Sequence, residues 1–384
     1  MSETIHKKFP RQTKKEKRRP TPRPEVYDLY WKFAAKRQEI FEKRMAGAAA
    51  PWTDDPILQN FKFCNVYRAA DRVSQFLIRE VAYNPTNNSN ADRLFQIVAF
   101  RTFSKPETWL EITRELGHAP VLSDLKSGAF EAALTKVKNR GNGLYTGAFI
   151  LCANKAFGFD EKHRNHVALF KQMFLQCDLA AKIEAAPSLK AIVELLESFP
   201  LTGPFMSYQT AIDLNYSAIV NFDEDDFTQA GPGALRGIKK AFIDIGDYTP
   251  TEIIKSMVNN QEKEFARLKL SFDGLWGRRL HAIDCQGLFC ELDKYCREAV
   301  PQLTSIRTRI KKRFKASPEP MKLFFPPKWR LNERIKVSGQ AGREKGEFHL
   351  SSDPVGRPQR GTRQGEALLP MGDVRPMTGN QVDR

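Results

Sequence analysis

Apolar residues recur at helical spacing through most of the chain between residues 25 and 300. The clearest example is residues 61–81, where one helical face is aliphatic and the opposite face is charged. The aliphatic face contains Val66, Ala70, Val73, Leu77 and Val81. Similar patterns predict helices at residues 25–41, 91–103, 106–116, 122–138, 161–179 and 188–198. Strand-like alternation never extends beyond a few residues, so we expect a mainly α fold.

Two stretches with helical periodicity, residues 201–217 and 281–295, carry carboxylates, amides and phenols where a core helix would carry Leu or Ala. Buried polar groups need partners, so helices of this composition usually line a functional site. In the first stretch, Gln209 and Asp213 share a face, and Tyr216 follows one turn later. We therefore expect both helices to contribute to one site.

Three carboxylates in these stretches are our candidates for catalysis: Asp213, Asp284 and Glu291. Beside a reacting sugar, a carboxylate can act as a general base or stabilise developing positive charge. The alternative for Asp213 is a local structural role near the end of its helix. The alternative for Asp284 is an internal ion pair, since a buried acid needs a cationic partner such as Arg68, Arg72 or Lys294.

Polar side chains close to these carboxylates are our candidates for binding a base. They are Asn65, Arg68, Asp71, Arg72, Tyr208, Gln209, Asn215 and Gln286. The members from residues 61–81 would line one wall of a pocket. Their alternative role is a ladder of ion pairs on the surface of that helix.

The turn Gly231-Pro-Gly233 precedes a basic helix and is similar to the hairpin of helix-hairpin-helix DNA-binding elements. Glycines let the backbone approach a phosphate, and a helix N-terminus adds N–H donors and partial positive charge. The predicted phosphate-binding set is Gly231, Gly233, Arg236, Lys239 and Lys240. The alternative is that this turn simply ends one helix and begins the next.

Positive charge is concentrated at the two ends of the helical region. Of the net charge of +16, residues 1–24 contribute +7 and residues 301–336 contribute +9, whereas residues 25–300 sum to −1. The 301–336 segment also contains aromatic residues among its cations: Phe314, Phe324, Phe325 and Trp329. Basic and aromatic residues together suit a nucleic-acid groove, so we expect DNA as the partner.

Several classes of protein are disfavoured. No apolar run is long enough for a membrane span, no secretory signal is recognisable, and the six cysteines fit reduced thiols. A Walker A loop and a dinucleotide fingerprint are absent from the sequence. His163 and His166 and the cysteines do not follow the usual zinc spacings, so we expect neither a metal nor a cofactor.

Six segments together resemble a known family. They are residues 30–38 (YWKFAAKRQ), 51–58 (PWTDDPIL), 65–75 (NVYRAADRVSQ), 213–217 (DLNYS), 230–234 (AGPGA) and 284–295 (DCQGLFCELDKY). The resemblance is to the α-glutamyl/putrescinyl-thymine pyrophosphorylase family, the clade-three type in particular. Its helical module is also known as the helical domain of 5-hydroxymethyl-deoxyuridine DNA kinase. The match spans about residues 25–300.

The resemblance implies a helical fold similar to helix-hairpin-helix DNA glycosylases and action on 5-substituted pyrimidines in DNA. Phage members join amino acids or polyamines to an activated thymine methyl, and some bacterial relatives resemble antiphage glycosylases. Without a P-loop, the kinase activity should not carry over. The glycosylase pattern places an Asp after the hairpin, but Glu252 is the acid nearest that distance, and Asp244 and Asp247 fall too early.

The sequence therefore predicts a basic arm without order at residues 1–24, a helical base-acting domain at 25–300, a basic and aromatic extension at 301–336 and a disordered tail at 337–384. Our leading hypothesis is a DNA glycosylase-like enzyme that flips out and excises a 5-modified pyrimidine. A transferase acting on a pyrophosphorylated 5-hydroxymethyl base and a non-catalytic reader are the alternatives. We expect a cytoplasmic protein, near the nucleoid in a bacterium or in the nucleus of a eukaryote. The oligomeric state stays open.

Overall fold

The structure is a computed structural model that describes residues 16–86, 88–141, 143–147, 155–303, 307–310, 312–315 and 322–335. All of them belong to one compact unit, residues 1–339. Residues 1–15 of the predicted arm and the predicted tail at 337–384 lie outside the described residues.

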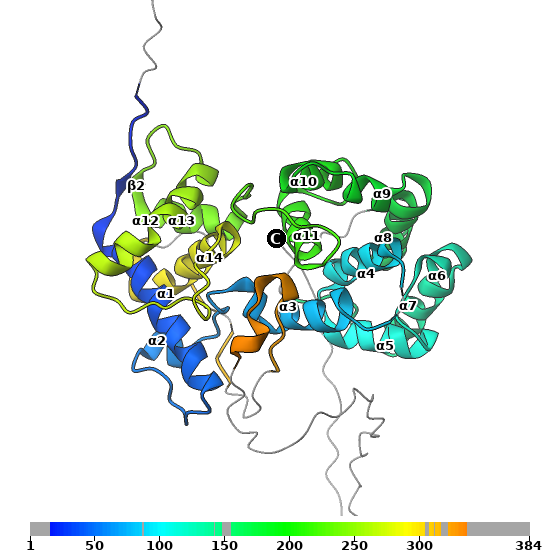
Figure 1. The fold of residues 1–384 in the computed structure, drawn as a ribbon, viewed down its shortest axis with the longest axis horizontal. Coiled ribbons are helices and arrows are strands. Elements are labelled where there is room, and N and C mark those ends of the chain that lie inside the picture. Colours follow the sequence, from blue (N-terminus) through cyan, green and yellow to red (C-terminus); the bar gives the residue numbers. More distant parts are fainter. Residues whose placement is uncertain are drawn as a thin grey trace, which may run out of the picture. The chain divides into compact units, whose positions relative to one another are not determined.

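Helices dominate this unit, as the sequence predicted (Figure 1). The α-helices are α1 (Pro24–Met45), α2 (Pro56–Asn60), α3 (Arg72–Phe76), α4 (Asn90–Phe103), α5 (Pro106–Leu116), α6 (Leu122–Ser127), α7 (Ala129–Asn139), α8 (Lys162–Phe170), α9 (Leu179–Glu184), α10 (Leu189–Glu197), α11 (Pro204–Tyr216), α12 (Pro232–Ala241), α13 (Pro250–Arg267) and α14 (Ala282–Ala299). Short 3₁₀ turns are η1 (Arg68–Ala70), η4 (Pro301–Leu303), η5 (Pro327–Trp329) and η6 (Asn332–Arg334). Two π-helical turns, η2 (Leu77–Ala82) and η3 (Lys171–Gln176), continue α3 and α8.

Local sequence explains most helix ends. Proline occupies the first turn of α1, α2, α5, α11, α12 and α13, where its missing N–H costs nothing. The Ser188 side chain caps α10 by accepting a hydrogen bond from the Ala191 amide. Gly128, at φ +89°, separates α6 from α7 within the predicted 122–138 helix, because a left-handed residue ends a helix.

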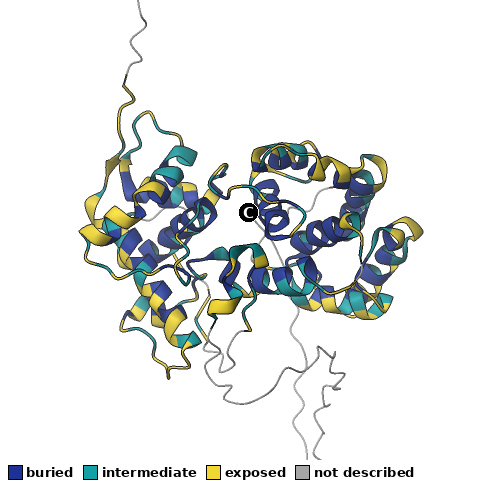
Figure 2. Cartoon of the chain, in the orientation of Figure 1, coloured by how far each residue is buried: buried dark blue, intermediate teal, exposed yellow. Residues whose placement is uncertain are grey.

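Two sets of helices pack around α11 and α14. Helix α14 contacts α1, α12 and α13, and α11 contacts α4 and α10. Both α11 and α14 are buried along most of their length, whereas the outer helices expose one face (Figure 2). The two polar helices singled out from the sequence are therefore central. No helix among the described residues has the length and apolar character to cross a membrane.

The first part of the predicted 61–81 helix is not helical. Residues 61–67 are extended, η1 follows, and regular helix begins only at Arg72. The aliphatic positions Val66, Ala70, Leu77 and Val81 are nevertheless all buried. The apolar spacing identified the buried positions correctly, but an extended segment and a 3₁₀ turn bury the first of them as well as a helix would.

The basic arm has order where the structure describes it. Strand β1 (Thr21–Pro22) pairs antiparallel with β2 (Phe242–Asp244), with Thr21 opposite Asp244. Lys17 pairs with Glu252 at 2.6 Å, and Arg18 pairs with Asp244 at 2.7 Å. Residues 16–23 thus differ from the expected disordered arm because acids of the helical body neutralise part of their charge.

The extension after α14 packs back onto the body. Phe325 is fully buried, and Trp329 lies edge-on to Tyr216 with ring centroids 5.5 Å apart. Nζ of Lys328 donates to the carbonyls of Asn215, Ser217 and Val220 at 2.5, 3.0 and 2.9 Å. Lys328 thereby satisfies carbonyls at the C-terminal end of α11. Phe325 and Trp329 thus pack into the fold, and nucleic-acid binding by the extension stays a prediction.

Candidate functional site

Arg68 lies at the meeting point of α11, α14 and η1. Its Nη1 donates to Oδ1 of Asp213 at 2.7 Å, and its Nε donates to Oε1 of Gln209 at 2.9 Å. Its backbone N–H donates to Oδ1 of Asp284 at 2.9 Å. Burial alone would lower the pKa of Arg68, but the neighbouring Asp213 holds that pKa above its ordinary value. Arg68 thus joins three other members of the predicted site.

Asp213 is enclosed between two guanidinium groups. It is fully buried, and Arg101 of α4 donates to its second carboxylate oxygen. A buried carboxylate of this kind stabilises the arginines that surround it, and losing it would leave them uncompensated. No part of Asp213 reaches solvent, and its two oxygens hold Arg68 and Arg101, so catalysis by Asp213 stays a prediction.

Asp284 joins the start of α14 to the 61–71 segment. Its Oδ2 accepts a hydrogen bond from the backbone N–H of His281 at 3.1 Å, while Oδ1 holds Arg68. Burial raises the pKa of Asp284 to about 6. Both carboxylate oxygens therefore have backbone N–H partners within the fold, Asp284 forms no ion pair with any described residue, and catalysis by Asp284 stays a prediction.

Glu291 and Asp71 hold the same 61–71 segment from other sides. Glu291 accepts a hydrogen bond from the Cys64 amide at 3.0 Å and pairs with Lys294 at 2.5 Å. Asp71 accepts from the Asn65 amide at 2.8 Å, and burial raises the pKa of Asp71 to about 6. Asp284 and Glu291 thus hold the 61–71 segment to α14, and Asp71 holds it from within.

The other predicted base-binding residues have separate surroundings. Tyr208 is fully buried against Phe227, and Asn215 makes two hydrogen bonds to the backbone of Phe222, at 2.8 and 3.0 Å. Gln286 donates to Sγ of Cys290 at 3.3 Å. Arg72 is exposed on α3. Base binding by these residues stays a prediction.

The glycines of the predicted hairpin allow close helix packing. A Cβ at Gly231 would lie 2.5 Å from the Phe205 ring, and a Cβ at Gly233 would lie 2.9 Å from Sγ of Cys290 on α14. A Cβ at Gly237 would lie only 2.0 Å from the Phe289 carbonyl oxygen. These contacts favour the structural alternative for the turn, and phosphate binding by Gly231 and Gly233 stays a prediction.

The cations of α12 divide into two groups. Arg236 and Lys240 point toward the fully buried Asp293, at 3.0 and 3.1 Å, and Arg297 reaches it at 2.8 Å. Burial would raise the pKa of Asp293, but hydrogen bonds from these three cations hold it below its ordinary value. Of the three predicted phosphate-binding cations, Lys239 is the exposed one.

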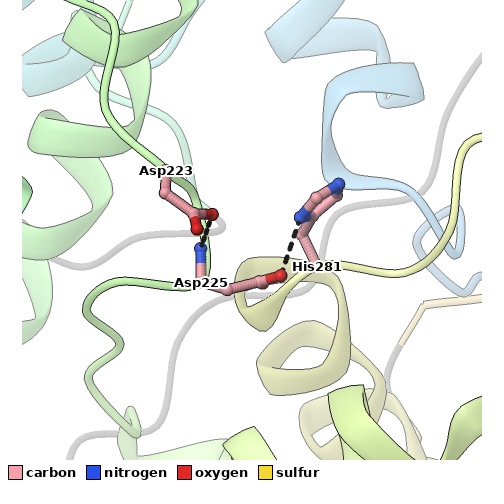
Figure 3. A group of neighbouring side chains, drawn as sticks. All are labelled: Asp223, Asp225 and His281. Carbon is pink, nitrogen blue, oxygen red and sulfur yellow. Dashed lines mark hydrogen bonds and ion pairs between the residues drawn. The ribbon is translucent and has the colours of Figure 1, made fainter.

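A histidine–aspartate pair that the sequence analysis did not select lies at the N-terminus of α14. Nδ1 of His281 is 3.1 Å from Oδ2 of Asp225, and Oδ1 of Asp225 accepts from the Ala282 amide at 2.8 Å (Figure 3). Burial would lower the pKa of His281, but its hydrogen bond to Asp225 holds that pKa above the ordinary value. The second ring nitrogen points away from Asp225 (Figure 3). The side chains of both residues keep part of their surface exposed.

Asp284 connects this pair to Arg68, because its two oxygens accept from the backbone N–H groups of His281 and Arg68, and a separate chain of contacts approaches Arg68 from Glu224. Arg278 pairs with Glu224 at 2.5 Å and lies over the Trp329 ring, 3.7 Å from its centroid. Trp329 meets Tyr216, and the Arg68 guanidinium lies 5.6 Å from the Tyr216 ring centroid. We call this set the polar centre. It comprises Arg68, Asp213, Tyr216, Glu224, Asp225, Arg278, His281, Asp284, Lys328 and Trp329.

One trio among the described residues offers three possible metal ligands, Asp223, Asp225 and His281, with one ligand atom from each within 4.8 Å of the others. Oδ1 of Asp223 already accepts from the Asp225 amide at 2.9 Å (Figure 3). A cation bound by all three side chains would compete with the hydrogen bond between Asp225 and His281. In this structure the trio is a hydrogen-bonded histidine–aspartate pair beside an exposed carboxylate.

Residues 24–305 match a family described as "5-hmdU DNA kinase, helical domain". The chain belongs to this family. It is 27% identical over 288 residues to the 5-hmdU DNA kinase of Bacillus phage SP10, an alignment that covers 70% of this chain and 45% of the relative. The chain thus spans less than half the length of that relative. No solved structure shows significant similarity to the chain.

Proposed function

We propose that this protein acts on a modified pyrimidine in DNA and that His281 and Asp225 transfer the proton in the reaction. The pair carries the proposal because it is partly exposed, lies in the polar centre, and has a histidine whose hydrogen bond to Asp225 raises its pKa, as suits a general base. The substrate class is supported by membership of the 5-hmdU DNA kinase helical family and by the strongly basic composition.

The reaction that we favour is hydrolytic excision of the base. Neutral His281 takes a proton from water, and the resulting hydroxide oxygen forms a bond to C1′ of the deoxyribose. The C1′–N1 bond breaks, and its electron pair leaves with the pyrimidine. Asp225 stabilises the imidazolium, and the exposed Asp223 carboxylate is placed to stabilise positive charge on the sugar.

The nearby cations already have partners within the protein, which favours excision over transfer to a pyrophosphorylated base. Arg68 is paired with Asp213, Arg278 with Glu224, and Lys328 with three backbone carbonyls. Release of diphosphate requires cations that are available to stabilise a leaving group with several negative charges. The cations of the polar centre are already engaged within the protein.

The test is incubation with duplex DNA that carries hydroxymethylated, glucosylated or pyrophosphorylated pyrimidines, followed by mass spectrometry. Release of free base with alkali-labile strands is the expected result and should be lost in His281→Gln. A heavier nucleoside formed only with added amine would identify a transferase. Binding without any product would identify a reader. His118→Gln is the matched control, because His118 is about half exposed and contacts Asp124 at the start of α6.

A further inference from the structure

A second region with unusual chemistry is a pocket of about 370 Å³ beside the C-terminal half of α1. Its walls come from α1, the link before α2, α2 itself, the extended segment after it and one residue of the later extension. The lining residues are Arg37, Ile40, Arg44, Ala50, Pro51, Trp52, Thr53, Leu58, Gln59, Phe61, Phe63 and Phe314. We call it the aromatic pocket. None of the polar-centre residues lines it.

Aromatic rings and guanidinium groups alternate around the aromatic pocket. The Arg44 guanidinium lies 5.0 Å from the Trp52 ring centroid, and Trp52 is edge-on to Phe314 at 6.2 Å. Arg313, next to Phe314, lies 4.7 Å from the Phe61 ring centroid. The 312–314 segment is held in place by backbone hydrogen bonds, such as that from the Phe314 amide to the Asn60 carbonyl at 2.9 Å. Flat rings with guanidinium groups lying over some of them suit a flat ligand that carries negative charge.

The two arginines of the aromatic pocket lack a directly paired acid within the described residues, and Asp71 and Glu291 act on Arg37 only at longer range. Arg37 is 8% exposed, and its Nη2 donates to Oδ1 of Asn65, a neutral partner, at 2.5 Å. Within the described part of the chain, Nη1 of Arg37 has no hydrogen-bond partner, and neither Arg37 nor Arg44 forms an ion pair. The nearby Asp55 is occupied by Tyr295 at 2.6 Å and Lys36 at 3.6 Å. Burial lowers the pKa of both arginines, which reflects the cost of this arrangement.

We propose that the aromatic pocket binds a nucleotide. The base stacks among Trp52, Phe61 and Phe314, and a carbonyl oxygen on its edge accepts the free N–H of the deeply buried Arg37. The phosphate meets Arg44, which is only half-buried, with the exposed Arg313 beside it. The volume falls at the lower end of the range for small-ligand pockets, roughly 300–1,000 Å³, and suits one nucleotide.

The same chemistry can come from a free mononucleotide or from one nucleotide of a DNA strand. The binding measurement therefore uses four probes with the full chain: dTMP, thymidine, inorganic phosphate and a short single-stranded oligonucleotide. Isothermal titration should show binding of dTMP or of the oligonucleotide, and tighter binding of dTMP than of thymidine. Competition between dTMP and the oligonucleotide distinguishes a pocket that takes both from one that takes only a strand.

Two variants test the pocket and one provides a matched control. Arg44→Gln should weaken nucleotide binding about tenfold, the scale of one hydrogen bond to a charged group, and should narrow the difference between dTMP and thymidine. Trp52→Leu should weaken binding of both. Lys43→Gln removes the same charge from the adjacent exposed position, where Lys43 pairs with Glu39, and should bind like the parent. Thermal unfolding verifies that each variant is folded.

Three results would overturn the proposal. One is the absence of binding of both dTMP and the oligonucleotide at millimolar concentration. Another is unchanged binding in folded Arg44→Gln and Trp52→Leu. The third is binding of inorganic phosphate as tight as that of dTMP, which would indicate an anion site. His281→Gln should bind nucleotide like the parent, so failure of the excision proposal would leave this result unaffected.

Discussion

The polar centre and the aromatic pocket contain the same kinds of side chain but differ in how their charges are balanced. In the polar centre, Asp213 lies between Arg68 and Arg101, and both oxygens of Asp284 have partners. In the aromatic pocket, Arg37 is nearly as deeply buried but keeps an N–H without a partner. Leaving a buried N–H without a partner costs free energy, so the Arg37 N–H is the place where a ligand acceptor would add most, whereas the charges of the polar centre are already paired. Burial of polar groups alone does not distinguish the two.

Among our predictions, the largest difference should be in the stability lost when one charge is removed from each region. Asp213→Asn keeps the size of the side chain but leaves two buried guanidinium groups uncompensated, so we expect the free energy of unfolding to fall by about 3–5 kcal/mol. Arg44→Gln should change it by less than about 1 kcal/mol, because no ion pair is lost. Denaturant unfolding measures both. Equal stability losses would contradict the contrast between the regions.

The next largest effect should be on the excision rate, when His281 at the partly exposed edge of the polar centre is replaced. His281→Gln should lower the excision rate by about two orders of magnitude with little change in stability, since a general base contributes on that scale. In the parent, the single-turnover rate should rise with pH and reach half its plateau above pH 6.5, because Asp225 raises the pKa of His281. Asp225→Asn should move that midpoint to lower pH.

The raised pKa of His281 also predicts the direction in which the stability of the protein changes with pH. The folded-state pKa of His281 is raised by Asp225. The stabilisation from this hydrogen bond is therefore complete below the unfolded-state pKa of His281 and is lost as the pH rises through the folded-state pKa. A pH–rate midpoint that Asp225→Asn leaves unchanged would remove this pair from the reaction.

Substituting a glycine where α12 packs on α14 should cause a stability loss of intermediate size. Gly237→Ala would place a Cβ 2.0 Å from the Phe289 carbonyl oxygen, so we expect a loss of about 1–3 kcal/mol or more. Gly287→Ala is the matched control, because a Cβ there has no neighbour within 4 Å and alanine favours helix by roughly 0.5–1 kcal/mol. Loss of DNA binding by a Gly237→Ala protein of full stability would return this region to the DNA interface.

The smallest effect should come from Lys328. Burial lowers its pKa to about 8 from the ordinary 10.5. The unfolded chain therefore binds more protons than the folded chain between about pH 8 and 10.5, so stability should rise with pH across this window. Lys328→Met should lack this rise, whereas Lys315→Met, at an exposed position, should retain it. Thermal unfolding at several pH values provides the measurement.

Short-range signals made most helices predictable. The predicted helices at 106–116 and 188–198 correspond to α5 and α10, because a proline or a serine cap marks the start and apolar spacing continues to the end. The break at residues 61–71 was not predictable, since buried positions there have helical spacing by coincidence. The non-helical form of this segment depends on partners far away in the sequence, among them Asp284 and Glu291, together with the local bond from Asp71.

The residues of the candidate site could be predicted from the sequence, but their hydrogen-bond and ion-pair partners could not. Helical spacing identified Gln209, Asp213 and Asp284 as buried polar residues, and all three contact Arg68. Whether a side chain remains available to a substrate depends on its partners, and these lie far away in the sequence. His281 was missed because a single histidine before a helix has no periodic signal, and its partner Asp225 lies 56 positions earlier in the chain.

The connection between Asp213 and its two arginines has a kinetic consequence. The carboxylate joins residues 145 and 112 positions away along the chain. Contacts of such sequence separation require large loops to close, and we expect them to form after the folding transition state. Interactions that are absent from that transition state act mainly on the rate of unfolding. Asp213→Asn should therefore shorten the lifetime of the native protein many-fold while the chain still refolds at nearly the parental rate.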